Sequence, residues 1–328
     1  MDRTLLYLSE SDVRASLDMK GAIKAVEEGL HALGQGKAVQ PEKIYMDIEK
    51  YHGFVKPMTA YVKPMEIIAS KIFTFFPENP RKYNLPTVSA IIVLTNPKDG
   101  ATIAIMDGTY ITALRTAATT AIAAKYLAKK NSQIVGIIGA GVQGRSHLMA
   151  LNEIFNLKEV RIADKFNDAK ENFTKEMQER FNFPIIPSES YEKTIKGADI
   201  VITATTGDEP LVKKGQFEEG MFLAKVGSYQ EIDFEIVQST ADKIVVDWWE
   251  YVSHRVKEIA KLLEAGVITR ERIYSELADI VVGEKRGRES SKEKILFISI
   301  GMGVEDASAA LVAYNNALKQ GIGQRLRV

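Results

Sequence analysis

The chain has 328 residues with no cysteine, and its 43 Lys and Arg residues balance its 43 Asp and Glu residues. The lack of cysteine excludes disulfides, thiolate nucleophiles and Cys-ligated metal, and the four histidines lack metal-site spacing, so we expect no metal. Zero net charge without like-charge blocks argues against nucleic-acid binding, and no apolar run approaches the roughly 20 residues that span a bilayer, so we expect a cytoplasmic protein with no membrane partner.

The length predicts two domains, and the first part of the chain reads as a helix followed by a sheet. A Ser/Asp start, apolar residues at helical spacing and terminal glycines predict one helix over residues 9–37. The segments GFVKPMTAYVK, EIIASKIFTFF and TVSAIIVL predict strands, and NPKDG predicts a turn to a further strand, ATIAIMD. The Ala-rich segment that follows predicts a helix that ends by residue 131.

Beyond residue 131, short buried strands alternate with amphipathic helices. The predicted strands are QIVGIIG, EVRIAD, ADIVITATT, MFLAKVG, DKIVVDWW and the start of EKILFISIGMGVEDASAALVAYNNAL. This alternation predicts the α/β class, with a doubly wound parallel Rossmann sheet and right-handed crossovers. We expect the closing Ala-rich helix to return to the first domain.

The strongest local motif is GAGVQG, which lies between an apolar strand and a helical pattern. Gly139 would permit the tight turn, Gly141 would let the backbone approach a diphosphate, and Gly144 would let the helix pack on the strand. The intervening Val142 and Gln143 then lie at the helix N-terminus, where backbone N–H groups favour phosphate. A structural glycine turn is the alternative, but strand, helix and a following acid in register favour a dinucleotide site.

Asp164 closes the next predicted strand, 20 residues after Gly144. An acid there would bind the ribose hydroxyls and repel a 2′-phosphate, so the sequence favours NAD (NADH) over NADP. Further cofactor contacts are expected at the carboxyl ends of later strands, although ordinary loop sequence is the alternative. These are Thr203, Thr205, Val226, Gly227 and Ser228.

Two basic residues indicate a pocket in the first domain. Lys71 sits inside the apolar strand IIASKIFTFF, where an ammonium group is costly unless it faces a cavity or an anion. Arg115 opens an otherwise nearly uncharged helix, and its rigid fork suits a carboxylate. A strand-edge or surface position is the alternative for each residue.

The FPENP, LPTVSA, MDGTYITALRTAA, GAGVQG and GRE segments together resemble the ornithine cyclodeaminase/μ-crystallin family over nearly the whole chain. This family includes cyclodeaminases, archaeal-type alanine dehydrogenases and ketimine or imino-acid reductases. The resemblance implies a discontinuous α+β domain for substrate binding and dimerisation, at residues 1–128 and 305–328. It also implies an NAD-binding Rossmann domain at residues 129–304 and a homodimer.

The resemblance also assigns roles to residues. Lys71 and Arg115 would hold the substrate carboxylate, and Lys71 would in addition transfer a proton. Arg115 with Thr87 and Thr116 would lie near the cofactor, and Gly301 would border the substrate. Relatives carry Arg in a QPxR-like segment, but this chain has QPEK. Lys43 would therefore offer the substrate carboxylate a single point charge in place of a guanidinium that binds it through two hydrogen bonds.

A second departure bears on the reaction. Cyclodeaminases and the alanine dehydrogenase have an active-site Asp where this chain has Tyr229, which suits an imino-acid reductase or an amino-acid dehydrogenase better than a cyclodeaminase. Tyr229 would pack on the nicotinamide or take an acid role, and Glu231 or Asp233 could replace the carboxylate after a loop shift. We expect Asp306 to cap the last helix rather than act as a catalytic acid.

The sequence therefore predicts an NAD(H)-dependent oxidoreductase that acts on the C–N bond of a small L-amino acid or the corresponding imino acid. The alternative is an ornithine cyclodeaminase, which would form proline and ammonia and recycle its NAD. A further alternative is a μ-crystallin-like protein that binds the nucleotide with little catalysis.

Overall fold

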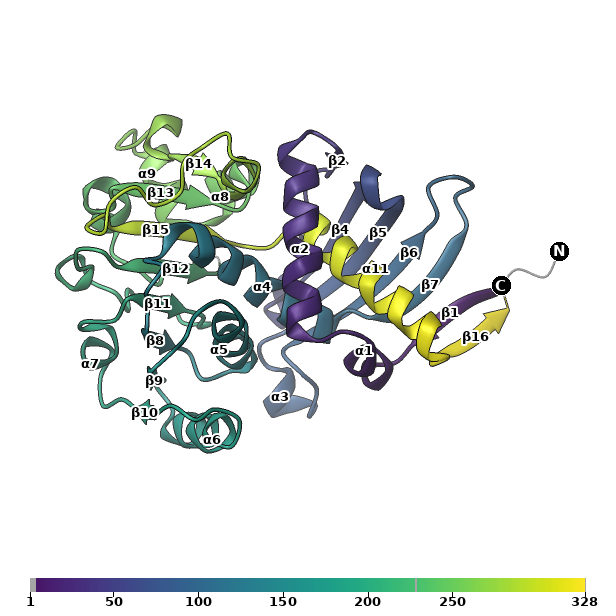
Figure 1. Ribbon diagram of the computed structural model, residues 1–328, viewed down its shortest axis with the longest axis horizontal. Helices are drawn as coiled ribbons and strands as arrows, with labels where there is room; N and C mark the ends of the chain where they lie inside the picture. The colour runs from purple at the N-terminus through teal and green to yellow at the C-terminus, as the bar shows by residue number, and fades with distance from the viewer. Residues whose placement is uncertain (1–3, 228, 328) are drawn as a thin grey trace. The chain divides into compact units, whose positions relative to one another are not determined.

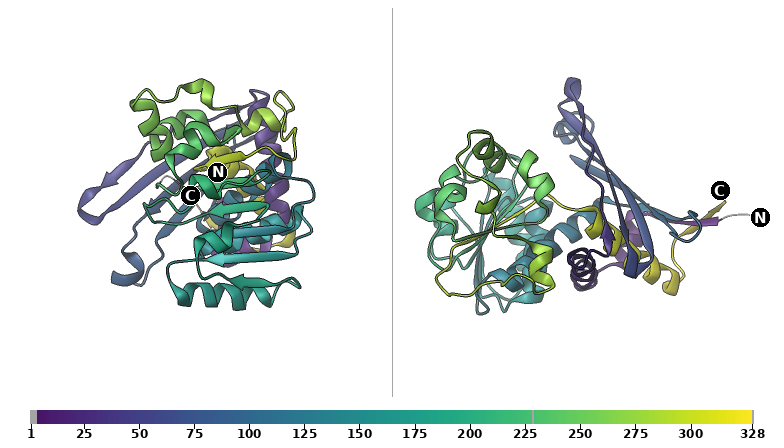
Figure 2. Two further views of the ribbon diagram at one scale, coloured as in Figure 1. Left: turned by 90° about the vertical axis from the view of Figure 1, so that its left-hand side faces the viewer. Right: turned by 90° about the horizontal axis from the view of Figure 1, so that it is seen from above.

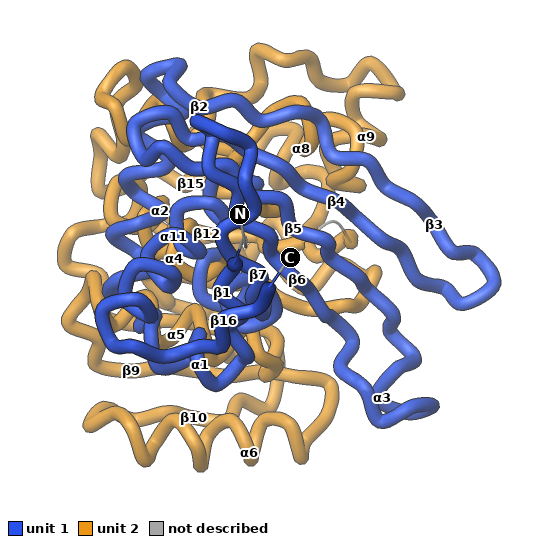
Figure 3. The backbone as a smooth tube through the Cα atoms, turned by 90° about the vertical axis from the view of Figure 1, so that its right-hand side faces the viewer, with its two compact units in different colours: residues 1–115, 302–328 blue, residues 116–301 orange. Residues whose placement is uncertain are grey.

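The computed structural model describes residues 4–227 and 229–327 and divides into two compact units (Figure 3). Unit 1 comprises residues 1–115 and 302–328, and unit 2 comprises residues 116–301. The first division falls inside helix α4 (Thr109–Leu127), before the expected boundary near residue 128. The helix is continuous across this point because its Ala-rich sequence contains no glycine or proline.

Unit 1 is built on a mixed sheet. Its strands are β1 (Thr4–Leu8), β2 (Ala38–Val39), β3 (Met46–Ile48), β4 (Gly53–Val62), β5 (Ile67–Phe75), β6 (Val88–Thr95), β7 (Thr102–Asp107) and β16 (Gln324–Arg327). The order is β16, β1, β7, β6, β5, β4, β2, with β3 paired to β4. Strands β4 to β7 are the four predicted strands, and each of them pairs antiparallel with the next. The predicted turn is present, because the Gly100 N–H donates to the Asn96 carbonyl at 2.9 Å.

The helices of unit 1 are α1 (Glu10–Ser16), α2 (Met19–Gly34), α3 (Asn79–Lys82), α11 (Gly303–Gln320) and the first residues of α4. Helix α11 packs on α2 and on strands β4 to β6 (Figure 1). The prediction of a single helix from Ser9 is wrong, since the segment forms α1 and α2. The break occurs because the Asp18 carboxylate accepts a hydrogen bond from the Gly21 N–H at 2.7 Å and so begins a new helix.

Unit 2 is a parallel sheet. Its strands are β8 (Ile134–Ile138), β9 (Glu159–Ala163), β10 (Ile185–Pro187), β11 (Ile200–Thr203), β12 (Phe222–Val226), β13 (Lys243–Val246), β14 (Ser275–Glu276) and β15 (Ile295–Ser299). They run in the order β10, β9, β8, β11, β12, β15, β13, β14, and each strand is parallel to its neighbours in this order. The chain reverses its direction of growth between β8 and β11, which is where doubly wound sheets bind ligands.

Helices cover both faces of this sheet (Figure 2). They are α5 (Val142–Ile154), α6 (Asn167–Gln178), α7 (Tyr191–Ile195), α8 (Trp249–Arg255), α9 (Lys257–Glu264), α10 (Leu277–Val281) and the second part of α4. Burial on both faces explains why the strands are runs of Ile, Val and Leu rather than alternating sequences. The predicted fold class is confirmed. No helix in the described part of the chain has the length and apolar character needed to cross a bilayer.

Candidate functional site

The glycine loop between β8 and α5 has the geometry of a dinucleotide site. Gly139 has φ +117°, and a Cβ there would lie 2.4 Å from the Ala204 carbonyl oxygen. A Cβ on Gly144 would lie 2.2 Å from the Gly139 carbonyl oxygen, so the helix and the loop are in contact. A Cβ on Gly141, by contrast, would meet nothing within 4 Å. The loop therefore offers an open backbone surface at the one glycine that a diphosphate approaches.

The N-terminus of α5 also suits an anion. Gly141 is the N-cap residue, so no side chain caps the first N–H groups of the helix, and Val142 is 66% exposed. Asp164 follows β9, and its carboxylate accepts hydrogen bonds from the N–H groups of Ala140 at 2.8 Å and Phe166 at 2.9 Å. The acid is thus held beside the glycine loop, as a ribose ligand would be. These residues fit NAD.

At the carboxyl end of β11, the two predicted threonines are bound to Glu231. The fully buried Glu231 carboxylate accepts hydrogen bonds from the Thr203 hydroxyl at 3.0 Å and from the N–H and hydroxyl of Thr205 at 2.7 and 2.8 Å. Burial raises the pKa of Glu231 to about 7, against the opposing charge of Lys225. In this structure Glu231 fixes the loop after β11, and sequence reasoning missed that link.

Strand β12 ends at Val226, and Gly227 follows with φ +129°. The buried Lys225 ammonium donates to the Gly227 carbonyl at 2.7 Å and holds this turn. Ser228 lies outside the described residues. Tyr229 is 37% exposed, and the carboxylate of Asp233 accepts a hydrogen bond from the Lys214 N–H at 3.0 Å.

Gly301 ends unit 2 just after β15. It has φ +78°, and its N–H donates to the buried Asp247 carboxylate at 2.7 Å, as does the N–H of Ile300. A residue with a side chain would be strained in this conformation, which explains the glycine in the IGMG turn.

In unit 1 the structure brings Lys71 and Arg115 together with two carboxylates of α11. The Lys71 ammonium donates to Asp306 Oδ1 at 2.6 Å and to the Thr112 hydroxyl at 3.2 Å. The Arg115 guanidinium donates from Nε to Asp306 Oδ1 and from Nη1 to Glu305 Oε2, both at 2.9 Å. All four charged side chains are almost completely buried. We call Lys71, Arg115, Glu305 and Asp306 the charged cluster.

Burial and the charges of the cluster shift the pKa values of Lys71 and Asp306. Burial lowers the pKa of Lys71 to about 7, the charge of Arg115 acts in the same direction, and Asp306 opposes both. Burial disfavours ionisation of Asp306, but the charges of Arg115 and Lys71 outweigh it and hold the pKa of that carboxyl below its usual range. Asp306 Oδ2 is buried and has no hydrogen-bond partner among the described residues. The cluster therefore combines an amine that can exchange a proton near neutral pH with a buried acceptor oxygen that the described residues leave without a donor.

The prediction that Asp306 caps the last helix is wrong. Helix α11 begins at Gly303 with Met302 as its N-cap residue, and the Met302 N–H donates to Glu305 Oε2 at 3.0 Å. Asp306 lies inside the first turn and points to Lys71 and Arg115 instead. The available signal was the Glu-Asp pair at the start of an Ala-rich helix whose only other charged residue is Lys319, which is the same kind of signal that identified Arg115.

The two remaining predicted residues of unit 1, Thr87 and Lys43, lie on irregular segments. Thr87 directly precedes β6, and its carbonyl accepts a hydrogen bond from the Phe76 N–H at 2.8 Å. Lys43 is buried and lies between β2 and β3. Thr116 follows Arg115 on α4 but belongs to unit 2, and it is also buried.

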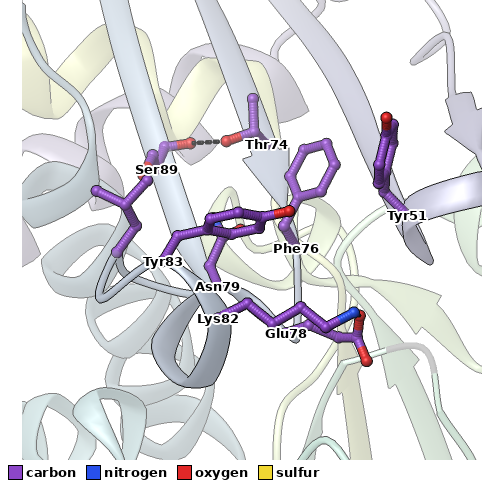
Figure 4. A pocket seen from close by; sticks show the side chains of 9 residues that line it. Tyr51, Thr74, Phe76, Glu78, Asn79, Lys82, Tyr83 and Ser89 are labelled. Carbon is purple, nitrogen blue, oxygen red and sulfur yellow. Dashed lines mark hydrogen bonds and ion pairs between the residues drawn. The ribbon is translucent and has the colours of Figure 1, made fainter.

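A hollow of about 460 Å³ lies near the adjoining ends of β5 and β6 (Figure 4). It is lined by Tyr51, Thr74, Phe76, Glu78, Asn79, Lys82, Tyr83, Leu85 and Ser89. Thr74 is three residues from Lys71 on the same strand, so it lies on the opposite face of the sheet. The hollow is therefore separate from the charged cluster, and no predicted site residue lines it.

Comparison with known proteins gives the family. The chain matches the ornithine cyclodeaminase/mu-crystallin family over residues 4–321. It is 36% identical to an alanine dehydrogenase of Archaeoglobus fulgidus over 98% of both chains. The structure of a Thermococcus litoralis Δ1-pyrroline-2-carboxylate reductase, in complex with NADH and L-proline, is 40% identical, with a TM-score of 0.94 over 98% of this chain and 99% of that one. An archaeal alanine dehydrogenase dimer with bound NAD is 35% identical, with a TM-score of 0.92 over 99% of each chain. The resemblance seen in the sequence is confirmed, and the chain belongs to the ornithine cyclodeaminase/mu-crystallin family.

Proposed function

We propose that the protein is an NAD(H)-dependent oxidoreductase that acts on the C–N bond of a small L-amino acid or the corresponding imino acid. The observation that carries this proposal is the buried Lys71, whose pKa near neutrality suits proton exchange with an amine or imine nitrogen. The relatives support it, because an alanine dehydrogenase and a pyrroline-carboxylate reductase both catalyse redox chemistry at such a bond.

We infer that unit 2 binds the cofactor and unit 1 the substrate. The cofactor residues of unit 2 are Thr116, Gly139, Gly141, Val142, Gln143, Gly144, Asp164, Thr203, Thr205, Val226, Gly227 and Ser228. Thr87 and Arg115 contribute to the same ligand from unit 1, and Lys43, Lys71, Arg115 and Gly301 contribute to the substrate site. The open backbone at Gly141 and the anchored Asp164 support the assignment of NAD.

NAD(H) held by the residues of unit 2 would supply the hydride chemistry at the substrate α-carbon. The protein orients the substrate and moves the proton. In the reductive direction the Lys71 ammonium donates a proton to the imine nitrogen. In the oxidative direction the neutral amine of Lys71 removes a proton from the substrate ammonium. Asp306 Oδ2, which accepts no hydrogen bond from the described residues, receives a substrate N–H and so fixes the nitrogen beside Lys71.

We also infer that the protein forms a homodimer through the sheet of unit 1. Pro57, Ile72 and Ile91 are register partners across β4, β5 and β6, on the sheet face opposite Lys71. Ile72 and Ile91 are 53% and 54% exposed, which is unusual for isoleucines in the middle of a sheet. The related alanine dehydrogenase is a dimer, which supports this assignment.

The proposed reaction is tested by following the absorbance of NADH. The pure protein is mixed with NAD⁺ and a panel of L-amino acids, and separately with NADH and linear or cyclic imino acids. A net change in NADH in either arm is the expected result. Proline formed from ornithine with no net change in NADH would instead establish a cyclodeaminase. Tight NADH binding without turnover would indicate a μ-crystallin-like binding protein.

Two glycine variants test the cofactor site. Gly141→Ala has room for its methyl group, so we expect normal folding but an NADH dissociation constant raised about tenfold, as the loss of one charged hydrogen bond predicts. Gly144→Ala places its methyl group against the Gly139 carbonyl, so we expect a loss of about 1–3 kcal/mol in the free energy of unfolding. Thermal unfolding and NADH titration separate the two effects. Unchanged NADH affinity in Gly141→Ala would contradict the assignment.

Asp164 is expected to set the preference for NAD. Asp164→Ala should lower the ratio of kcat/KM for NAD to that for NADP, because the repulsion of the 2′-phosphate is removed. Asp164→Asn is the matched control, since it removes the charge but keeps an oxygen for the Ala140 N–H. Both variants should shift the ratio alike. A shift in the alanine variant alone would mean that the side chain only anchors the loop.

A further inference from the structure

Glu231 connects the segment after β12 to the loop after β11. Strands β8, β11 and β12 are neighbours in the parallel sheet, so their carboxyl ends lie side by side (Figure 1). The buried Glu231 carboxylate accepts one hydrogen bond from Thr203, the last residue of β11, and two from Thr205 in the loop that follows. Because Thr205 donates from both its N–H and its hydroxyl, Glu231 fixes the backbone of this loop as well as a side chain.

The loop that Glu231 holds packs on the glycine loop. A Cβ on Gly139 would lie 2.4 Å from the carbonyl oxygen of Ala204 and 3.3 Å from the methyl carbon of Thr205. The Ala204 N–H also donates to the Ile138 carbonyl at the end of β8, at 2.9 Å. A displacement of Thr205 therefore reaches the turn at Gly139, where the dinucleotide site begins.

The backbone of Glu231 is itself held on two sides. Its N–H donates to Glu258 Oε1 on α9 at 3.0 Å, as does the N–H of Ile232 at 3.2 Å. Its carbonyl accepts hydrogen bonds from the N–H groups of Leu211 and Val212 at 2.8 and 3.2 Å. The Glu258 side chain is also completely buried. The fold therefore sets the position of the Glu231 carboxylate, and the loop after β11 is arranged around it.

The buried charges near Glu231 leave its carboxylate without a salt-bridge partner. The Lys225 ammonium of β12 lies 3.4 Å from Glu258 Oε2, whereas Glu231 has no ion pair within 4.0 Å among the described residues. Burial raises the pKa of Glu231 to about 7, although the charge of Lys225 and the hydrogen bonds from Thr203 and Thr205 act in the opposite direction. The loop after β11, the segment after β12 and the start of α9 carry these other ionisable side chains: Asp208, Glu209, Tyr229, Asp233, Lys257 and Glu258.

We propose that Glu231 is a positioning residue of the cofactor site, and that its ionised carboxylate holds the loop after β11 in the arrangement that binds NADH. The proposal rests on the assignment of the cofactor to unit 2 and adds a control of its affinity by a proton. All three hydrogen bonds to Glu231 come from donors, and such bonds are about twice as strong to a charged acceptor as to a neutral one. NADH should therefore bind more tightly in alkaline than in acidic solution.

Glu231→Gln tests the proposal, because it keeps the size of the side chain and an oxygen for the Thr205 N–H but removes the charge. The dissociation constant of NADH is measured by fluorescence titration over about two pH units on either side of pH 7. For the wild type, we expect it to rise about fivefold as the pH falls below about 7, which is the difference between a charged and a neutral hydrogen bond. Glu231→Gln should show the higher value at every pH. Glu219→Gln, at an exposed position just before β12, should follow the wild type.

A second variant separates this role from a purely structural one. Thr203→Val keeps the shape of the side chain but removes a hydrogen bond that stabilises the ionised carboxylate of Glu231. The pH at which the NADH affinity changes should therefore move upward, which a contribution to folding alone would not cause. Thermal unfolding of each variant at every pH confirms that the titrated protein is folded.

Three results decide between the possibilities. The same pH dependence in the wild type and in Glu231→Gln would overturn the proposal. A wild-type dissociation constant that falls with the pH would also overturn it, because the charge of Glu231 would then repel the diphosphate of NADH. A wild type that binds NADH but converts no amino or imino acid would overturn the proposed function alone, and one that binds no NADH would overturn both.

Discussion

Lys71→Ala is expected to lower kcat by about 10²- to 10⁴-fold, the usual range for loss of a general acid or base. The affinity for NADH should remain nearly unchanged, because Lys71 and the glycine loop belong to different compact units. Folding should survive, since Asp306 keeps its hydrogen bond to Arg115. Single-turnover kinetics and NADH titration measure the two quantities.

The control for this variant is Ser70→Ala, the neighbouring residue on β5, whose side chain lies on the other face and contacts the Thr59 hydroxyl. The pH dependence gives a second test. With a pKa of about 7, Lys71 is protonated below that pH, so kcat for imine reduction should fall as the pH rises through about 7. Amino-acid oxidation needs the neutral amine and should rise over the same range. Parallel profiles in both directions, or full turnover of Lys71→Ala, would remove Lys71 from proton transfer.

Asp306→Ala is expected to lower the free energy of unfolding by about 3–5 kcal/mol, the usual effect of breaking a buried ion pair. The variant leaves Lys71 buried without its ion-pair partner and removes one of the two carboxylates that bind Arg115. Its carboxyl is ionised in the folded protein at neutral pH, because its pKa is depressed. The contribution of Asp306 to the free energy of unfolding should therefore be complete above the pKa that its carboxyl has in the unfolded chain. It should decline as the pH falls through the lower pKa of the folded protein.

Denaturant unfolding with spectroscopic detection measures this effect. Asp208→Ala is the matched control, because its ion pair with Lys257 is exposed and should contribute less than about 1 kcal/mol. A loss of the same small size in Asp306→Ala would show that the charged cluster adds nothing to stability. Asp306→Asn preserves the shape but not the charge, and it should be destabilised as well.

The fold was predictable where one local rule decided the outcome. The short buried strands predicted for unit 2 became parallel strands, and the β-branched and aromatic segments of unit 1 became β4 to β7. The break between α1 and α2 was missed because the apolar periodicity continues through it, while a local side-chain hydrogen bond at Asp18 begins the second helix. Strands β1 and β16 were missed because each is short and is completed by pairing with a segment at the other end of the chain.

The candidate site was predictable only in part. Lys71 and Arg115 stood out as charges in apolar segments, but their partners on α11 lie about 190 residues or more further along the chain. The sequence of β4 contained a similar signal, because Lys56 is a charged residue on the same face of the strand as the apolar Met58, Ala60 and Val62. No local rule indicates that a charge on one strand lies near a charge on the next.

The sequence by itself determined the family, the parallel sheet and the glycine loop, because these depend on residue types at fixed short spacing. Gly144 packs against the Gly139 carbonyl of the same loop and Gly141 leaves an open backbone surface, whereas the close contact of Gly139 is with Ala204, which follows β11. Only the tertiary structure decided that Asp306 is an ion-pair partner and not a cap, and that Glu231 fixes Thr203 and Thr205. These properties depend on burial and on electrostatic distances between segments remote in sequence, and a charge acquires its pKa and its partner only when the fold removes water from around it.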